Sequence, residues 1–246
     1  MDKLLYIAMS GAKETMLAQT ANNHNLANAS TTGFRADLSA FQSRAVAGPG
    51  FASRVYATDA TTGWDATNGA QVSTGNDLDL AIQGDGFLAV QGTDGREAYT
   101  RAGNLHVDPN GQLLTGTGDP VLGDGGPISV PPYTSLTVAA DGTISIVPLG
   151  QSAATTATVG RIKLVNPDKS LVERGTDGLF RLSTGADAEP DANVRVASGA
   201  LESSNVNTAD AMVNMIELAR HFDLQVKAMH TAEEDANSAT QLLRMG

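Results

Sequence analysis

The feature that most constrains the fold is a repeat of apolar residues at the C-terminal end of the chain. From about residue 208 to residue 244, these residues recur at alternating spacings of three and four. Such spacing places them on one stripe of a helix, and ~35 helical residues span about 50 Å. A small β domain cannot cover so long a stripe, so the stripe must pack against another helix. The stripe consists of Met212, Met215, Ala219, Phe222, Val226, Met229, Glu233, Ala236, Thr240 and Leu243.

The N-terminal segment carries a matching stripe and is the expected partner. Residues 3–28 are predicted to form a helix whose stripe consists of Leu5, Met9, Ala12, Met16, Gln19, Asn23 and Leu26. The helix is expected to end near Asn28, because residues 28–33 favour a turn and finish with Gly33. We predict that the terminal helices pair as a coiled coil and that their stripes form an assembly interface. Polar stripe residues such as Asn23 and Glu233 are expected to fix the register or the choice of neighbour.

The middle of the chain has the pattern of an antiparallel β domain, with short apolar runs separated by glycine turns. The runs are 78–83, 87–91, 112–114, 135–138, 144–147 and 161–165, and the turns contain Gly86, Gly95, Gly111, Gly142 and Gly178. Residues 34–75 favour extended segments or a long hairpin. The sequence therefore predicts an α+β fold in three parts. These are residues 1–33 with 200–246 as a helical coiled-coil domain, 34–75 as an extended connector or hairpin, and 76–199 as a β-rich domain.

Composition excludes several kinds of partner. A formal net charge of −11 disfavours nucleic acid and anionic bilayers, which would repel the chain over about 8 Å in physiological salt. No apolar stretch approaches the ~20 residues of a membrane-spanning helix, and we expect no cleaved export signal. The chain has no Cys, which excludes disulfides and thiolate metal sites. We therefore expect no nucleic acid partner and no direct membrane insertion.

The sequence offers little basis for a metal or phosphate site. The four His residues lie far apart, without the short spacing of helical metal sites. The segment starting at Asp108 is similar to the beginning of a calcium loop but lacks the later acidic ligands, so a turn is expected there. Gly84-Asp85-Gly86 lacks a following helix and is expected to be a hairpin turn. We expect no metal and no cofactor.

Catalysis has one candidate pair of carboxylates. Asp77 and Asp79 lie on one face of a predicted strand and could pair for acid/base chemistry. Nothing nearby in the sequence supplies the burial that would separate their pKa values, so a solvated strand face is expected instead. No catalytic residues are predicted.

Three segments of the chain carry motifs of one known protein family. The N-terminal segment is Asn25-Leu26-Ala27-Asn28-Ala29-Ser30-Thr31-Thr32-Gly33-Phe34-Arg35. It resembles the signature of bacterial flagellar rod and hook proteins. A central segment is similar to the start of the family's β domain and is Asp77-Leu78-Asp79-Leu80-Ala81-Ile82-Gln83-Gly84-Asp85-Gly86-Phe87, continued by Tyr99-Thr100-Arg101-Ala102-Gly103-Asn104. The last segment is similar to the approach to the C-terminal helix and is Gly199-Ala200-Leu201-Glu202-Ser203-Ser204-Asn205-Val206, followed by Met212-Val213-Asn214-Met215-Ile216-Glu217. These matches occur in order and span the chain.

The resemblance implies a structural subunit of the flagellar basal-body rod, which polymerises through its terminal helices to help form the drive shaft. It implies proximal and distal rod proteins and the flagellar export apparatus as partners, and a location in the rod within the periplasm. It implies no catalytic residues. Residues 1–12 and the chain length are most similar to those of a proximal-rod member. The residues that carry the family motif are Asn28, Ser30, Thr31, Gly33 and Phe34.

Three alternatives stay open from the sequence. The first is a distal-rod or hook-family axial subunit. The second is a soluble binding module, with a β domain on a helical stalk and binding residues on its loops. The third is a hydrolase that uses Asp77, Asp79 or Asp85, which would need an enclosed pocket.

Overall fold

The computed structural model describes residues 3–45, 55–152 and 154–244, and the chain divides into two compact units. The helical unit consists of Met1–Ala29, Ala36–Trp64 and Val206–Gly246, and the β-rich unit consists of Ser30–Arg35 and Asp65–Asn205. The chain therefore passes between the units four times. Helices occupy both ends of the described sequence and antiparallel strands lie between them, which confirms the predicted α+β class.

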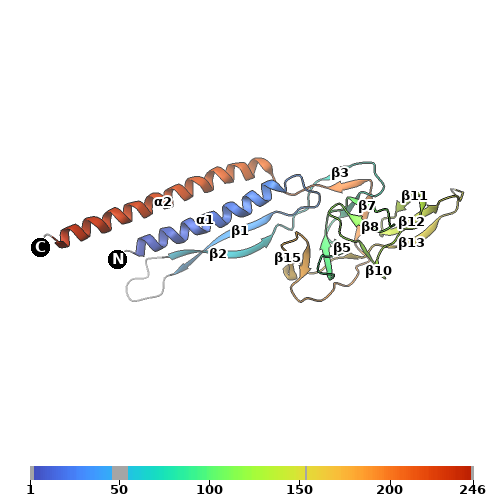
Figure 1. The fold of residues 1–246 in the computed structure, drawn as a ribbon, viewed down its shortest axis with the longest axis horizontal. Coiled ribbons are helices and arrows are strands. Elements are labelled where there is room, and N and C mark those ends of the chain that lie inside the picture. Colours follow the sequence, from blue (N-terminus) through green and yellow to red (C-terminus); the bar gives the residue numbers. More distant parts are fainter. Residues whose placement is uncertain (1–2, 46–54, 153, 245–246) are drawn as a thin grey trace. The chain divides into compact units, whose positions relative to one another are not determined.

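Two helices and a hairpin make up the helical unit. Helix α1 (Lys3–Ala27) and helix α2 (Thr208–Arg244) lie side by side, and strands β1 (Asp37–Ala45) and β2 (Val55–Trp64) run along α1 (Figure 1). The two strands pair antiparallel. Both helices lie where the apolar spacing of the sequence predicts them.

Three side chains near the end of α1 fix its neighbours. Asn22 donates a hydrogen bond to the backbone carbonyl of Ala211 at 2.8 Å. This bond joins the end of α1 to the start of α2, so the two helices run antiparallel. Asn25 accepts from the backbone N–H of Asp37 at 2.7 Å and donates to its carbonyl at 2.9 Å, while His24 Nδ1 lies 2.5 Å from the carboxylate of the same residue. These bonds hold the start of β1 against the last turn of α1.

Short antiparallel strands form the β-rich unit. They are β3 (Gln71–Ser73), β4 (Leu80–Gln83), β5 (Phe87–Gln91), β6 (Glu97–Thr100), β7 (Leu105–Val107), β8 (Leu113–Thr115), β9 (Leu122–Gly123), β10 (Gly126–Pro127), β11 (Tyr133–Val138), β12 (Thr143–Pro148), β13 (Ala157–Arg161), β14 (Leu164–Val165), β15 (Val172–Arg174), β16 (Phe180–Leu182), β17 (Arg195–Ser198) and β18 (Ala200–Glu202), with a 3-10 turn η1 (Lys169–Leu171). One sheet has the order β14-β5-β6-β16-β15 and another the order β11-β12-β13. The pairs β17-β4, β18-β3, β7-β8 and β10-β9 complete the pairing among the described strands.

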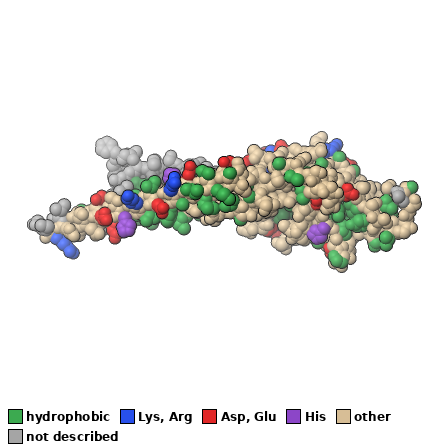
Figure 2. Space-filling model, turned by 90° about the horizontal axis from the view of Figure 1, so that it is seen from above, with side chains coloured by type: hydrophobic (Ala, Val, Ile, Leu, Met, Phe, Trp, Pro, Cys, Tyr) green, Lys and Arg blue, Asp and Glu red, His purple; other side chains and the backbone are tan. Residues whose placement is uncertain are grey.

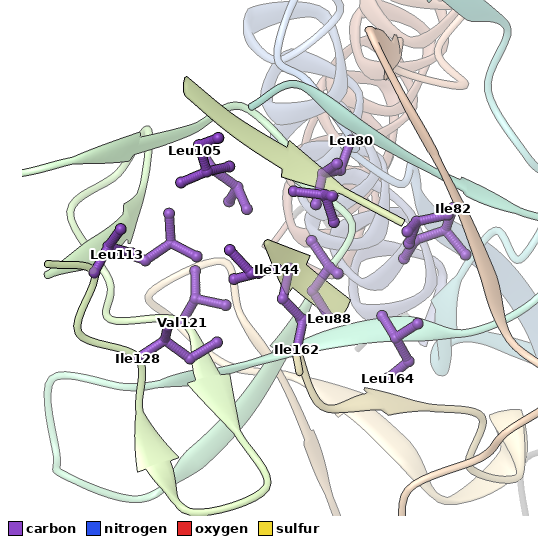
Figure 3. Close-up of a cluster of buried hydrophobic side chains, with 14 of the residues drawn as sticks. Leu80, Ile82, Leu88, Leu105, Leu113, Val121, Ile128, Ile144, Ile162 and Leu164 are labelled. Atoms are coloured by element: carbon purple, nitrogen blue, oxygen red, sulfur yellow. The ribbon is translucent and has the colours of Figure 1, made fainter. Parts of the chain in front are cut away.

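The main core of the β-rich unit is a cluster of aliphatic side chains that point toward one another (Figure 3). The residues labelled there are Leu80, Ile82, Leu88, Leu105, Leu113, Val121, Ile128, Ile144, Ile162 and Leu164. Ile144 is fully buried on β12, the central strand of its sheet. The buried residues described for this cluster are all branched aliphatic, while the buried aromatic side chains of the unit, Phe87, Tyr99 and Phe180, lie outside it.

Most of the predicted glycine turns close hairpins. Gly95, Gly111, Gly142 and Gly178 have positive φ and lie in the turns of β5-β6, β7-β8, β11-β12 and β15-β16. The predicted hairpin at Gly84-Asp85-Gly86 is wrong, because β4 before it pairs with β17 whereas β5 after it pairs with β6 and β14. At Gly86 an added Cβ would lie 2.8 Å from Cγ1 of Val194. Close packing therefore accounts for this glycine.

The compact units differ in extent from the three predicted parts. Strand β3 pairs with β18, so residues on both sides of 76–199 belong to the β-rich unit. The hairpin of β1 and β2 packs along α1 and belongs to the helical unit, and residues 46–54 of the predicted connector lie outside the described residues. The predicted division into three parts refers to parts that fold independently. Contacts within one folded chain do not test independent folding, so the division stays a prediction.

Candidate assembly surfaces

One row of the predicted stripe on α1 faces into the helical unit, and the other row faces solvent. The exposed row consists of Met9, Met16 and Asn23, and Leu5, the first residue of the inward row, is exposed as well. A row of residues that each precede Met9, Met16 and Asn23 by one position takes the inner place instead. The inner residues, buried or half-buried, are Ala8, Ala12, Thr15, Gln19, Asn22 and Leu26.

Helix α2 divides its predicted stripe in the same way. Its inward row, half-buried, consists of Met215, Phe222, Met229 and Ala236. In the other row Val226 is half-buried, while Met212 and Ala219 are exposed. One position earlier, Ala211 and Ala232 are buried, and Leu218 and Gln225 are half-buried. The side chain of Leu243 lies outside the described residues.

Small residues occupy several positions on the inner face of α1. An added Cβ at Gly11 would lie 2.9 Å from side-chain Cδ of Gln225 on α2. Ala8, Ala12 and Ala18 are buried on the same helix. Small residues therefore take several of the inner positions of α1, and the end of the Gln225 side chain fills the space over Gly11, while Met9 and Met16 lie outside. The sequence pattern marked the larger apolar residues and therefore selected one outward row on each helix.

The exposed apolar side chains of both helices make up what we call the outer apolar face. Hydrophobic side chains are visible among the charged ones along the surface of the helical unit (Figure 2). Leu5, Met9 and Met16 are 42%, 54% and 59% exposed. The full set is Leu5, Tyr6, Met9, Met16 and Leu17 of α1 with Met212, Val213, Ile216 and Leu224 of α2. Soluble proteins that act alone rarely expose so many large apolar side chains on two adjacent elements.

The first residues of the family motif end α1. The backbone N–H of Asn28 donates to the carbonyl of His24 at 3.2 Å and to that of Asn25 at 3.1 Å. Ser30 and Thr31 follow in a turn and are exposed. The helix therefore stops where the turn-forming residues of the motif begin.

The last residues of the motif enter the β-rich unit and are packed there. Gly33 is buried with φ of 68°, and an added Cβ would lie 2.3 Å from the carbonyl carbon of Arg101, so no other residue fits without displacing backbone. Phe34 is half-buried, and the guanidinium of Arg174 lies 4.6 Å from the centre of its ring. Arg174 also lies 5.0 Å from the ring of Phe180, which ties the motif to the β15-β16 hairpin.

Three buried charged residues beside the motif were not singled out by the sequence pattern. Arg35, Arg101 and Glu202 are 1%, 3% and 1% exposed, and Glu202 lies between the two guanidinium groups. Burial lowers the pKa of Arg35, and the charge of Arg101 lowers it further, whereas Glu202 raises it. Each of the three lies in a segment that resembles the rod and hook family, which is the signal that could have found them.

The acidic residues considered for catalysis do not form a site. Asp77 is exposed, as expected, but the expectation of a solvated face is wrong for Asp79, which is buried and accepts a hydrogen bond from Asn76 at 3.2 Å. Asp85 is exposed and forms an ion pair with Lys169 at 2.9 Å. The two carboxylates of the candidate pair therefore lie in different environments and do not act together.

The turn at Asp108 is confirmed. Its carboxylate accepts backbone N–H bonds from Asn110 at 2.9 Å and Gln112 at 2.6 Å, and the bond from Gln112 is the main cause that holds the pKa of Asp108 below its ordinary value. Across residues 3–45, 55–152 and 154–244, no group of three or more His, Asp or Glu side chains is placed to hold a metal ion. No helix in this described part of the chain combines the length and hydropathy that crossing a bilayer needs.

A cavity of about 390 Å³ in the β-rich unit contains an ion pair that is already complete. Lys163 donates to both carboxylate oxygens of Glu97, at 2.9 and 2.7 Å. Leu122 and Asp124 also line the cavity. The two partly buried charges therefore satisfy each other in the wall of the cavity.

Comparison with known protein families gives two matches on this chain. A family model described as the flagellar hook protein FlgE/F/G D1 domain matches residues 81–146. A second, described as the flagellar basal body rod FlgEFG protein C-terminal region, matches residues 197–242. The first match covers strands of the β-rich unit and the second covers β18 and most of α2.

Individual relatives match along their whole length. The flagellar basal-body rod protein FlgF of Escherichia coli (strain K12) is 47% identical over 251 residues, covering 100% of this chain and 100% of the relative. FlgF of Caulobacter vibrioides is 35% identical over 250 residues, covering 99% of this chain and 98% of the relative. The flagellar basal-body rod protein FlgG of Bacillus subtilis (strain 168) is 32% identical over 263 residues, covering 98% of each.

Proposed function

The chain belongs to the flagellar basal-body rod protein family and is most like FlgF within it, and we propose that it polymerises through the outer apolar face of its terminal helices. It is a structural subunit of the basal-body rod and not an enzyme, and its place is in the flagellar basal body. Membership of the family implies assembly with other flagellar rod and hook components.

The exposure of large apolar side chains on both helices is the observation that supports this proposal. The outer apolar face has nine such side chains, each roughly half exposed. If covering the exposed half of each contributes about 1 kcal/mol, the face supplies ~9 kcal/mol. Association of two proteins costs an estimated 4–15 kcal/mol, so one partner that covers this face would bind weakly. A subunit that enters a rod gains several neighbours at once, which favours addition to an existing assembly over pairing in solution.

The packing mode that we propose is a coiled coil extended by neighbouring subunits. Helix α2 is 37 residues long and α1 is 25, or about 55 and 37 Å of helix. Because the helices run antiparallel, the last turns of α2 have no matching length of α1 beside them. Helices of neighbouring copies are the partners whose stripes fit this segment, and the exposed rows with Met9, Met16, Met212 and Ala219 would face them.

Further parts of the proposal rest on family membership. The neighbours are proximal and distal rod proteins, the chain is delivered by the flagellar export apparatus, and it assembles in the periplasm. The β-rich part, predicted from the sequence as residues 76–199, is proposed to fold independently of the helices. The compactness of the β-rich unit and its own aliphatic core support this last point.

A charge placed on the outer apolar face tests the proposal. Ile216→Asp puts a carboxylate at a position that is 55% exposed in the single chain, so the monomer is expected to fold normally. Burial of that carboxylate between subunits would cost several kcal/mol. We therefore expect loss of swimming and of rod assembly in a strain that carries the variant as its only copy.

Asn214→Asp is the matched control, because it adds the same charge on the same helix at an exposed position about 160° around from Ile216. Swimming should persist with this variant. Normal swimming with Ile216→Asp, at a normal protein level, would remove the outer apolar face from the account.

A further inference from the structure

The β-rich unit meets the rest of the chain at three short segments, and all three converge on Glu202. The unit begins with Ser30–Arg35, resumes at Asp65 and ends at Asn205. The backbone carbonyl of Glu202 accepts from the N–H of Gly33 at 2.8 Å, and its Oε1 accepts from the N–H of Gly69 at 2.8 Å. A single residue thus bonds to backbone on both of the other segments.

The side chain of Glu202 is also buried, and its carboxylate lies between two buried cations, Arg35 and Arg101. Its Oε1 lies 2.8 Å from Nη2 of Arg35, and its Oε2 accepts from Nε of Arg101 at 2.7 Å and lies 2.6 Å from Nη2 of the same residue. Two guanidinium groups share one carboxylate in a site closed to water, and the charge of Asp65 acts on Arg35 as well. Removal of the carboxylate would leave two like charges buried and facing each other.

Each arginine extends the bonds to further backbone. Arg35 donates to the carbonyl of Thr67 and to the side-chain oxygen of Asn68 at 2.8 Å. Arg101 donates to the carbonyls of Gly86 at 2.7 Å and Gly84 at 2.9 Å. Arg35 therefore fixes the second segment, and Arg101 connects the cluster to the loop between β4 and β5.

Close backbone packing leaves no room for a side chain at two glycines of the cluster. An added Cβ at Gly33 would lie 2.3 Å from the carbonyl carbon of Arg101, and one at Gly69 would lie 1.9 Å from the carbonyl oxygen of Ser203. The glycines allow the three segments to approach within hydrogen-bonding distance of Glu202. The side chain of Asn205 adds bonds to the carbonyls of Asp65 at 3.2 Å and Thr67 at 3.0 Å.

These segments contribute nothing to the main hydrophobic core. The buried members of that core and the partly buried residues packed on it lie between Leu78 and Val196. Residues 30–35, 65–69 and 199–205 are outside that range and are held by the charged cluster and by hydrogen bonds. A segment with polar contacts and few apolar ones can open while the core stays folded.

We propose that Gly33, Arg35, Gly69, Arg101 and Glu202 form one cooperative element, which we call the junction clamp. In it, Glu202 holds the three connecting segments of the β-rich unit together. The clamp opens and closes separately from the aliphatic core. A hydrophobic contact of equal size could be as stable, but it would not specify which three segments meet or in which register, whereas a shared carboxylate does. The clamp goes beyond the proposed assembly function, since it acts within a single chain.

Amide hydrogen exchange of the full-length monomer with Glu202→Gln tests the clamp. This nearly isosteric change removes the anion and leaves Arg35 and Arg101 buried without it. We expect exchange at the amides of Gly33 and Gly69 to become on the order of 100-fold faster, with exchange at Leu88 and Ile144 unchanged. Glu173→Gln, at an exposed position of the same unit, is the matched control and should change neither set.

A second variant distinguishes the effect of the unpaired buried charges from a general loss of folding. Arg35→Met leaves the Arg101–Glu202 pair neutral, so exchange at Gly69 should rise less than in Glu202→Gln while the core amides stay protected. Unchanged exchange at Gly33 and Gly69 in Glu202→Gln would overturn the proposal. Loss of protection throughout the unit would also overturn it, because the clamp would then be part of the core. Neither result bears on assembly, which is tested at Ile216.

Discussion

The two faces of α1 predict opposite consequences for the same substitution. Ala18 is 3% exposed on the inner face and Met16 is 59% exposed on the outer face, two residues apart on one helix. Ala18→Asp places a carboxylate in the buried interior of the helical unit, where the protonated form is favoured. Keeping Asp protonated at pH 7 against an ordinary pKa of about 3.9 costs about 4 kcal/mol. Met16→Asp should leave the free energy of unfolding of the monomer unchanged.

The pH dependence separates this cost from simple crowding. The pKa of the introduced carboxyl is raised in the folded state, so its contribution to stability is most favourable below the unfolded pKa and is lost as pH rises toward the folded pKa. The charge-related cost in Ala18→Asp should therefore fall from about 4 kcal/mol at pH 7 to roughly 0.5 kcal/mol at pH 4. Ala18→Asn, with similar bulk and no titration, supplies the reference at each pH.

The assay is denaturant unfolding of the full chain at pH 7 and pH 4, followed by the helical circular dichroism signal. The difference between Ala18→Asp and Ala18→Asn should shrink by roughly 3 kcal/mol or more between the two pH values. A difference that does not depend on pH would refute the inner position of Ala18. A destabilisation by Met16→Asp as large as that by Ala18→Asp would refute the division of α1 into two faces.

Two further predictions concern the β-rich unit. Ile144→Ala removes a fully buried side chain from the central strand β12, so urea unfolding followed by a strand signal should show a loss of about 2–5 kcal/mol, and a loss below about 1 kcal/mol would mean that the core is loose there. Hydrogen bonds lower the pKa of Asp108, so its ionised form stabilises the folded chain above the unfolded pKa of about 3.9. On acidification below that value, the melting temperature of the native chain should therefore fall more than that of Asp108→Asn. Parallel curves of melting temperature against pH would contradict the turn geometry.

Periodicity and turn chemistry were enough to predict the helices and most of the strands. The alternating spacing from residue 208 to 244 matches α2, because a 3.6-residue period over about ten turns has no competing interpretation. Positive-φ glycines at Gly95, Gly111, Gly142 and Gly178 correctly marked hairpins. Gly84 and Gly86 have positive φ as well, but the strand before them pairs with a partner far along the chain, and local sequence contains no information about that pairing.

The assignment of faces was the harder problem. Met9 and Met16 have greater hydropathy than Ala8 and Thr15, so the spacing of large apolar residues favoured the outward row. The choice depends on which side chains of the two helices fit together, as where the Gln225 side chain of α2 lies over Gly11 of α1. Asn22 and Asn25 illustrate the same limit, since each has poor helix propensity but bonds to a neighbouring element.

The buried charges could not be predicted from single-chain patterns. Arg35, Arg101 and Glu202 lie at sequence separations of 66 and 101 residues, so no local spacing connects them. Charged residues are normally exposed, and only the folded chain brings these three together away from water. The resemblance to the rod and hook family marked their segments without indicating their contact.

Protection of one engineered thiol tests the central claim most directly. The chain has no Cys, so Ile216→Cys provides a unique thiol on the outer apolar face, and Thr93→Cys provides a control in the exposed turn between β5 and β6. The rate of maleimide modification is measured for each variant in the free monomer and in purified basal bodies. Assembly through the helices predicts that the thiol at position 216 reacts rapidly in the monomer and at least about tenfold more slowly in basal bodies. Equal rates at position 216 in the two states, in basal bodies that contain the variant, would contradict assembly through this face.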